Sequence, residues 1–289
     1  MVLPALGGMT LRKRRSEAAA TLTATLLTAP ADTYFLKLSV AVGDAVRLVD
    51  DGGEEVFLGS VHEVRRTPEQ TVLTAYDRGI YLTRNELYGV FSGSPADIVA
   101  QVAERLALPL GKVETEAGRR TIVSRSGQSA FSILRQAVGE QREIAVQGKA
   151  LTVTKSAWMA YSLPPEQVLE AQGAASLEQL TDRCVVVDRK GAVLATEENK
   201  ADLAAYGQMQ TVLLKNGTDP ASQAKAALRG RELCGKVTVL GNPAYRCGCA
   251  VELHRPDWGL DGVYAVTAAS HHWDRGIYTT VMELEFVRA

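Results

Sequence analysis

Residues that commonly carry chemistry are scarce in this sequence, which has four cysteines and four histidines among 289 residues. Four cysteines are too few for a disulfide scaffold in a chain of this length, so free thiols are expected. No apolar run approaches the roughly 18 residues that a membrane span requires. The 32 basic and 33 acidic residues give a formal charge of -1, whereas a protein that binds duplex nucleic acid normally has a basic excess. These absences argue against a membrane span and against nucleic-acid binding as the main role.

The composition that remains is that of a folded chain of two or three domains, because 46% of the residues are hydrophobic and 22% are charged. A basic cluster from Arg12 to Arg15 precedes a stretch of small residues and superficially resembles a secretory signal. Glu17 and four threonines make the following segment only weakly hydrophobic, which favours an alternating strand over the apolar core of a signal. We therefore expect β structure at this position.

Short strands separated by turns are predicted between Asp32 and Asp77. The turns contain Asp50 to Gly53 and Thr67 to Glu69, which are rich in residues that favour turns. The predicted strands cover residues 45–49, 56–66 and 71–76. Several short strands with this spacing are typical of a barrel or sandwich, and residues 1–77 are predicted to form part of a first β-barrel-like domain.

The hydrophobic period then changes to that of helices. Ser94-Pro95-Ala96-Asp97 combines an N-cap serine, a first-position proline and an acidic first turn, so it predicts a helix start. A second helix is predicted within residues 126–140, ending at Gly139, and a hairpin that turns at Gly148-Lys149 follows. The inward positions of the two helices are Ile98, Val99, Val102, Leu106, Phe131, Leu134 and Val138. Residues 78–155 are therefore predicted to form an α+β insert domain.

The rest of the chain is predicted to hold a connection and a second β-barrel-like domain. Residues 156–180 are interpreted as a linker or irregular connection, and residues 181–289 as the second domain. Helices are predicted over 197–206 and from Asp219-Pro220 to about residue 233, so this domain carries a helical insertion at about 196–235. Strands account for the rest. The predicted fold class is mainly β, with two similar small β-barrels separated by an α/β domain and helical connections.

The two strand-rich ends of the chain resemble each other. GDAVRLVDDGGEEVFLGSVHEV begins at Gly43 and GCAVELHRPDWGLDGVYAVTAASHH begins at Gly248, and both run from Gly-x-Ala-Val-x-Leu through a turn rich in Asp and Gly. Matching Val56 with Val263 across that turn places His271 close to His62 in the alignment. Short β motifs also match by accident, so the pattern alone leaves open whether the chain contains a true duplication.

Cys247 and Cys249 lie two residues apart, followed by His254, His271 and His272. Alternate residues of a strand share a face, so the two thiols and a later histidine could bind a metal. Structural zinc usually takes cysteines separated by two to four residues, and one intervening residue is too few. The favoured interpretation is that the thiols pack as small hydrophobic groups and the histidines lie near a strand end. A metal at these residues stays open as the alternative.

No catalytic arrangement is apparent elsewhere. Cys184 and Cys234 have no histidine nearby in sequence, and no Cys-x-x-Cys pair occurs. The adjacent carboxylates Glu54-Glu55 and Glu197-Glu198 are typical of solvated turns and first helical turns. SRSGQSAFS lacks the glycine and lysine spacing of a phosphate-binding loop. The residues therefore predict no catalytic, cofactor or metal site, and the chain is not expected to be an enzyme.

The order of these segments resembles the baseplate hub proteins of contractile phage tails and related particles, including the defective prophages and tailocins of Gram-positive bacteria. The most specific part is TAYDRGIYLTRNE followed by the SPADIV helix. The stretches VGDAVRLVDDGGEEVFLGSVHEVRR, SAFSILRQAV and VTVLGNPAYRCGCAVELHRPDWGLDGVYAVTAASHHWDRGIYTTVMELEF also match. Together they cover most of the chain, and the cysteines and histidines belong to no pattern of that family.

The resemblance implies two related β-barrels per chain with an α/β insert between or beside them. Three such chains would form a ring of six barrels that joins a six-fold tail tube to a three-fold spike, in a virion or phage-tail-like particle assembled in the bacterial cytoplasm. The implied partners are further copies of the chain, the tail tube protein, the central spike protein, a LysM-containing adaptor and wedge proteins of the baseplate. No catalytic residue is carried over, because the role of the hub is structural.

Other functions stay open on the sequence. A tail-associated peptidoglycan hydrolase would need a catalytic domain beyond the two barrels and the insert. A glycan-binding module of the tail tip would need a soluble ligand. A zinc-dependent fold would bind metal in stoichiometric amounts and lose stability with a chelator.

Overall fold

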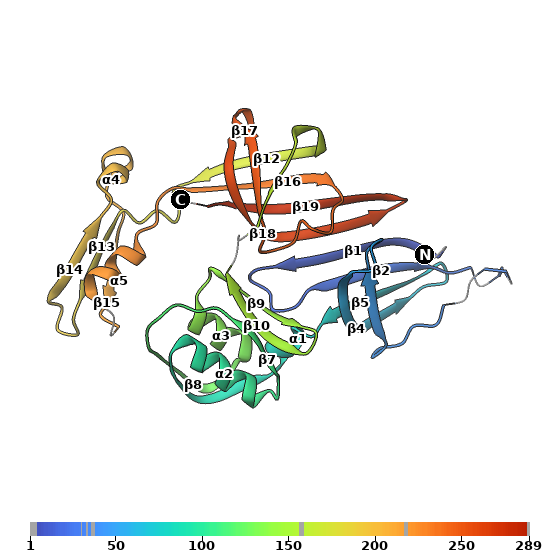
Figure 1. The fold of residues 1–289 in the computed structure, drawn as a ribbon, viewed down its shortest axis with the longest axis horizontal. Helices are drawn as coiled ribbons and strands as arrows, with labels where there is room; N and C mark the ends of the chain where they lie inside the picture. The colour runs from blue at the N-terminus through green and yellow to red at the C-terminus, as the bar shows by residue number, and fades with distance from the viewer. Residues whose placement is uncertain are drawn as a thin grey trace.

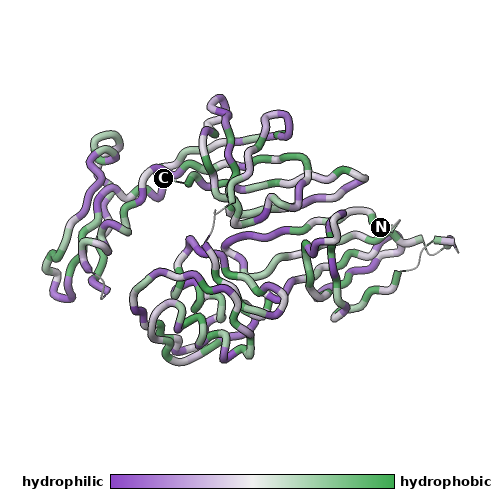
Figure 2. The backbone as a smooth tube through the Cα atoms, in the orientation of Figure 1, coloured by the Kyte–Doolittle hydropathy of each residue, from purple (hydrophilic) through white to green (hydrophobic). Residues whose placement is uncertain are grey.

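The computed structural model describes residues 5–29, 31–32, 34–35, 38–155, 159–216 and 219–287. The fold consists of an 11-stranded sheet and two inserted α/β units (Figure 1). Figure 2 shows hydrophobic and hydrophilic residues alternating along strands of the large sheet, and this period of two gives a strand one buried face. The predicted class, mainly β with an α+β insert, is confirmed.

The first unit of the large sheet comes from the N-terminal part of the chain. Its strands are β1 (Leu6–Arg14), β2 (Thr21–Leu27), β3 (Ala45–Val49), β4 (Glu55–Arg66) and β5 (Gln70–Asp77). They are hydrogen-bonded in the order β1-β2-β5-β4-β3. In β2, threonine alternates with apolar residues, so Leu22, Ala24 and Leu26 are buried. The segment after Glu17 therefore contains the strand β2, as its alternation predicts, and most of the basic cluster before it lies in β1.

The second unit is formed by the last part of the chain. Its elements are β11 (Ala160–Ser162), η1 (Pro165–Gln167), β12 (Val168–Ser176), β16 (Glu232–Leu240), β17 (Ala250–Arg255), η2 (Pro256–Trp258), β18 (Leu260–Asp274) and β19 (Ile277–Phe286). The order is β12-β16-β19-β18-β17, with β11 parallel to β17. The prediction of an irregular connection over 156–180 is wrong at β11 and β12. The β12 sequence VLEAQGAAS alternates apolar and polar residues only from Leu169 to Gln172, so its extended form over nine residues depends on pairing with β16.

The two units form one sheet because β1 pairs antiparallel with the second half of β18, from Gly8 opposite Asp274 to Arg14 opposite Ala268. The first half of β18 pairs with β17 instead. Hydrogen bonds among the described residues close neither unit into a barrel, and β3 and β12 end the main path of the sheet. The two predicted barrels are thus a five-stranded and a six-stranded unit of one continuous sheet.

The backbone repeats between the two units. β1, β2, β5, β4 and β3 have the same order as β12, β16, β19, β18 and β17. The amide of Gly43 donates to the carbonyl of Val61, and the amide of Gly248 donates to the carbonyl of Val266, both at 2.8 Å. Both glycines have a positive φ, 96° and 93°, which glycine adopts without strain. The alignment of Gly43 with Gly248 therefore corresponds to one repeated turn.

Two β-bulges also repeat. β4 shifts register against β5 at His62, and β18 shifts against β19 at Thr267. β1 shifts against β2 at Gly7, and β12 shifts against β16 at Leu169. A bulge places one extra residue at one point of a ladder, so this agreement favours duplication over accident.

The register corrects one part of the sequence alignment. Ala45 pairs with Ser60 and Ala250 with Ala265, which is the same separation in both units. Matching Val56 with Val263 would make the connection between the two strands longer by two residues in the second unit, whereas the strand pairing gives the same separation in both units. The counterpart of His62 is therefore Thr267, and the predicted correspondence between His271 and His62 is wrong.

The inserted α+β unit follows β5 along the chain. Its elements are α1 (Ile80–Arg84), β6 (Glu86–Gly93), α2 (Pro95–Arg105), β7 (Leu110–Val113), β8 (Arg120–Ser129), α3 (Ala130–Val138), β9 (Arg142–Gln147) and β10 (Ala150–Lys155). The Ser94 and Asp97 side chains each accept the other's backbone amide, which forms a capping box before Pro95. α3 begins at Ala130 with Ser129 as N-cap, later than predicted, because β8 pairs with β6 up to that residue. Its core includes Phe91, Ile98, Val99, Val102, Ile133, Leu134, Ile144, Leu151 and Val153.

The second inserted unit is a three-stranded sheet with two short helices, and one of its strands lies between those helices, where the sequence predicts a helical insertion. Its elements are β13 (Arg183–Val187), β14 (Val193–Glu198), α4 (Lys200–Tyr206), β15 (Gln210–Leu214) and α5 (Pro220–Ala227), and Figure 1 places it at one end of the molecule. Asn199 caps α4, so that helix starts after Glu197-Glu198, which lies on β14. α5 ends at Ala227 because Leu228 is extended. None of the described helices is long and apolar enough to cross a membrane.

Candidate functional site

The joint between the two units combines the β1–β18 ladder with charged side chains. Arg14 pairs with Glu283, and the Arg15 guanidinium lies 3.0 Å from the Glu285 carboxylate. The Arg15 side chain is only 10% exposed, so water screens this pair less than an exposed one. The basic cluster of the N-terminus thus ties the first unit to the last strand. Sequence analysis missed these pairs, because partners 269 and 270 positions apart leave no local pattern.

The α+β insert contacts this joint near Cys247. The Cys247 thiol lies 3.0 Å from a carboxylate oxygen of Glu143 on β9 and 3.3 Å from the carbonyl oxygen of Thr267. Arg135 of α3 donates to the carbonyl oxygen of Arg15 at 2.6 Å. Burial, together with the Glu143 carboxylate, raises the pKa of the Cys247 thiol. Cys247 is therefore a protonated hydrogen-bond donor between two parts of the chain at neutral pH.

The other residues considered for a metal have separate partners. Cys249 is buried in the core of the second unit, where burial raises its pKa to about 11. His254 is exposed on β17 and lies 3.0 Å from Asp261. His272 Nδ1 lies 3.1 Å from the Thr10 hydroxyl across the joint. Within the part of the chain that the structure describes, no three His, Cys, Asp or Glu side chains are grouped to hold a metal ion.

His271 is buried in an aromatic cluster at the joint. Its Nδ1 lies 2.9 Å from the Tyr278 hydroxyl and 3.1 Å from the Thr280 hydroxyl. The Tyr278 ring stacks on Trp273 with the ring centroids 4.4 Å apart. Burial lowers the pKa of His271 to about 4 and raises the pKa of Tyr278 to about 12. Both side chains are therefore neutral at pH 7, and the cluster packs as an uncharged part of the core.

This cluster predicts acid sensitivity. His271 has a pKa of about 4 in the folded protein and an ordinary value of 6.5, so between these values the unfolded chain binds the extra proton. The stability that His271 contributes is present above pH 6.5 and is lost as the pH falls through 4, by about 3 kcal/mol. Urea unfolding between pH 7 and 4 is expected to show a steeper loss of stability for the wild type than for His271→Gln. Equal slopes would contradict this assignment.

The remaining candidates from the sequence lie apart from one another. Cys184 is buried beneath α5, whereas Cys234 is exposed on β16. Glu55 pairs with Arg47 at 3.2 Å near an exposed turn. These positions are separate in the fold, and the structure brings none of them together with the histidines.

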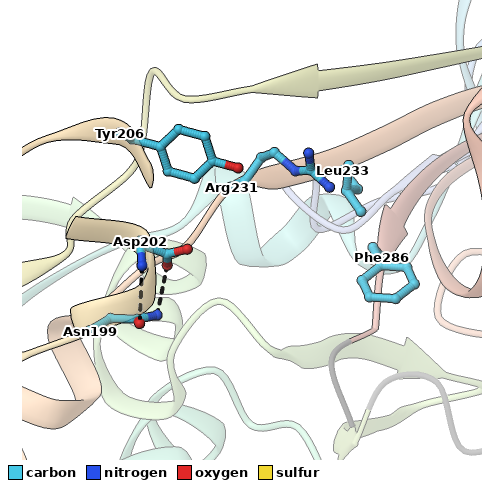
Figure 3. A pocket seen from close by; sticks show the side chains of 6 residues that line it. All are labelled: Asn199, Asp202, Tyr206, Arg231, Leu233 and Phe286. Atoms are coloured by element: carbon cyan, nitrogen blue, oxygen red, sulfur yellow. Dashed lines mark hydrogen bonds between the residues drawn. The ribbon is translucent and has the colours of Figure 1, made fainter. Parts of the chain in front are cut away.

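A pocket of about 300 Å³ lies between α4 and the end of the second unit (Figure 3). It is lined by Asn199, Asp202, Tyr206, Arg231, Leu233 and Phe286. The Asn199 side-chain amide donates to the Asp202 carboxylate at 2.7 Å, and the Asp202 backbone amide donates to the Asn199 side chain. These two polar side chains therefore serve the start of α4 and form no catalytic arrangement.

The outer edges of β12 and β3, and the edge of β4 beyond Val61, have no backbone partner among the described residues. β12 is paired only with β16, and β4 beyond Val61 is paired only with β5. Most residues of β12 are exposed or half-buried, as are those from Glu63 to Arg66. A free edge presents unpaired N–H and C=O groups that can add a strand from another chain. The edges of β12 and β4 are therefore suited to contacts with other chains, whereas the β1–β18 joint is already paired within this chain.

Solved structures share this architecture. The 43 kDa tail protein of prophage MuSo2 from Shewanella oneidensis has a TM-score of 0.71 at 15% identity, over 96% of this chain and 93% of that chain. The c3393 protein of E. coli is a component of the type VI secretion system and is structurally similar to the T4 bacteriophage tail proteins gp27 and gp5. It has a TM-score of 0.59 at 10% identity, over 98% of this chain and 74% of that chain. The chain thus shares its fold with a prophage tail protein and with a type VI secretion component, in agreement with the sequence resemblance.

The sequence comparison identifies the family. A family model described as YQBQ-like matches residues 9–286, so this chain belongs to the YQBQ-like family. The phage-like element PBSX protein XkdQ of Bacillus subtilis (strain 168) is 26% identical over 303 aligned residues, which cover 96% of this chain and 91% of that protein.

Proposed function

We propose that this chain is the structural baseplate hub of a contractile phage tail or a phage-tail-like particle such as a tailocin, without enzymatic turnover. Three copies form a ring of six similar units. The ring joins a six-fold tail tube on one side to a three-fold spike on the other. Its further partners are a LysM-containing adaptor and wedge proteins of the baseplate, and the particle is assembled in the bacterial cytoplasm.

The observation that carries this proposal is the internal repeat. Two units with the same strand order, the same turn at Gly43 and Gly248 and two shared bulges occur in one chain. Three chains around a closed ring then offer six similar surfaces to a six-fold tube, while the inserted units occur only three times. The similarity to prophage tail proteins supports the same role.

The mass of the full chain in solution tests the proposal. Light scattering over a concentration series is expected to give three times the chain mass for the chain alone, or a complex that contains three chains when a tail tube protein is added. Electron micrographs of the mixture should show rings at tube ends. A chain that neither forms a ring nor binds the tube protein would contradict the hub. Release of soluble fragments from peptidoglycan by the purified protein would instead favour the hydrolase alternative.

A further inference from the structure

The internal joint has an unfilled counterpart in the same chain. The repeat matches β1 with β12 and β18 with β4. In each unit, one line of directly paired residues crosses four neighbouring strands. The line in the second unit is Gly173, Gly235, Leu284 and Val266, and the equivalent line in the first unit is Leu11, Leu22, Ala75 and Val61. In the second unit, β1 occupies the edge of β18 beyond Val266. In the first unit, the same edge of β4 beyond Val61 carries no strand among the described residues.

β12 is the matching strand, and the edge that it turns away from β16 has no strand partner among the described residues. β1 is paired on both edges, with β2 and with β18, whereas its counterpart β12 is paired only with β16. One chain therefore contains one complete joint, formed by β1 and β18, and the two strands of an equivalent joint, β12 and β4, that are not paired with each other. Six strands lie between β12 and β4 along the sheet, namely β16, β19, β18, β1, β2 and β5. The two halves therefore cannot meet within one chain and require a second copy.

We infer that β12 of one copy adds antiparallel to the free edge of β4 in a second copy, in the register of the internal joint. This inference rests on the proposed ring and assigns the contact between its chains. In the internal joint, Leu11, Arg12, Lys13 and Arg14 lie opposite His271, Ser270, Ala269 and Ala268. The same register between chains places Gly173, Ala174, Ala175 and Ser176 opposite Arg66, Arg65, Val64 and Glu63.

The side chains at these positions are complementary in size. Ala174 is small and leaves room for the long side chain of Arg65 opposite it, whereas the space beside Gly173 is filled by the carbonyl group of Trp258. Exposed edges are usually guarded by charged residues or proline, but the β12 segment from residue 171 to 176, AQGAAS, has neither. An unguarded edge of this kind is suited to a partner strand.

The contact between chains differs from the internal joint in charge. Ser176 takes the place of Arg14, and Thr74 takes the place of Glu283. The Arg14–Glu283 ion pair of the internal joint therefore has no counterpart between chains. The contact between chains therefore depends on backbone hydrogen bonds and packing. We expect it to be weaker than the internal joint, so that folded chains can associate after synthesis.

A disulfide between chains tests the register. Arg65→Cys and Ala174→Cys are introduced together in the full chain, and Cys234→Ser is added because Cys234 lies directly opposite Ala174 on β16. Directly opposed residues in an antiparallel pair have Cα atoms about 4.5–5.5 Å apart, which suits a disulfide. Mild oxidation is expected to link chains covalently, up to a closed trimer, on a non-reducing gel.

The matched control moves one cysteine by two residues on the same face of β12, as Arg65→Cys with Gln172→Cys. It is expected to link less than a tenth as much, since diagonal positions are too far apart for a disulfide. A trimer that links equally well through the shifted pair, or through neither pair, would overturn the register while leaving the proposed hub intact. A chain that stays monomeric and unlinked both alone and with the tube protein would overturn both.

Charge at the same position provides a second measurement. Ala174→Lys places a cation opposite Arg65 and is expected to weaken association about fivefold, because like charges directly opposed in a sheet destabilise it. Ala174→Glu places an anion there and is expected to preserve association or strengthen it. Equal dissociation constants for the two variants, measured by light scattering or sedimentation, would contradict the pairing of these residues.

Discussion

Gly241→Ala is expected to lower the free energy of unfolding by about 3 kcal/mol, at the upper end of the range for overpacked cores. A Cβ atom at Gly241 would lie 2.0 Å from Cγ of the Tyr278 ring, with both Cδ atoms within 2.3 Å. The ring cannot easily move aside, because Trp273 stacks on it and its hydroxyl lies 2.9 Å from His271. Backbone movement is opposed by the hydrogen bond from the Gly241 amide to the Tyr278 carbonyl. Urea unfolding followed by tryptophan fluorescence measures the loss.

Removing the ring provides the control for this prediction. Tyr278→Ala is destabilising by itself, but it opens the space that the new methyl group needs. In that background, Gly241→Ala is expected to cost about 1 kcal/mol or less, so the double-mutant cycle should give a coupling of about 2 kcal/mol. The same cost in both backgrounds would mean that Gly241 is required for its backbone conformation and not for the close approach of Tyr278.

Phe91→Ala is expected to cost about 3–5 kcal/mol, because it removes a fully buried ring from the core of the α+β insert. The substitution also removes the cation–π contact with the Arg105 guanidinium, which lies 4.3 Å from the centroid of the Phe91 ring. Val90→Ala is the matched control, since Val90 is the preceding residue of β6 and is 57% exposed. It is expected to change stability by about 0.5 kcal/mol or less. Comparable losses for the two variants would contradict the assigned faces of β6.

The same variant tests whether residues 78–155 unfold as a separate unit, as we propose. The insert has its own hydrophobic core and is attached to the large sheet through contacts such as those of Arg135 and Cys247. We expect calorimetry of the full chain to show two transitions and Phe91→Ala to lower only one. A single transition that shifts as a whole would show that these contacts couple the insert to the sheet.

Much of the fold could be predicted from local patterns. Ser94-Pro95-Ala96-Asp97 predicts the start of α2, and alternation after Glu17 predicts β2, because capping and burial of one face are decided by neighbouring residues. The turn at Gly43 could be matched with the turn at Gly248, since both require a residue with positive φ. The resemblance to baseplate hubs was likewise available from sequence stretches spread along most of the chain.

Other features could not be predicted, because residues distant in sequence decide them. β12 has only a short alternating pattern and is extended over its full length because β16 pairs with it. The correct partner of His62 in the repeat required the bulges, which appear only in the ladders. The separate surroundings of Cys247 and Cys249, near each other in sequence, depend on Glu143 for one thiol and on the core of the second unit for the other.

The sequence by itself therefore determined most of the strands, the capped helices and the class of protein, since these depend on periodicity, turn residues and motifs within short segments. Only the tertiary structure decided how the two units are joined and which edges stay open. That choice depends on the pairing of β1 with β18, where Arg14 and Glu283 meet across 269 positions of chain. Contacts at such separations contribute to stability only once the chain has folded, so no local pattern records them.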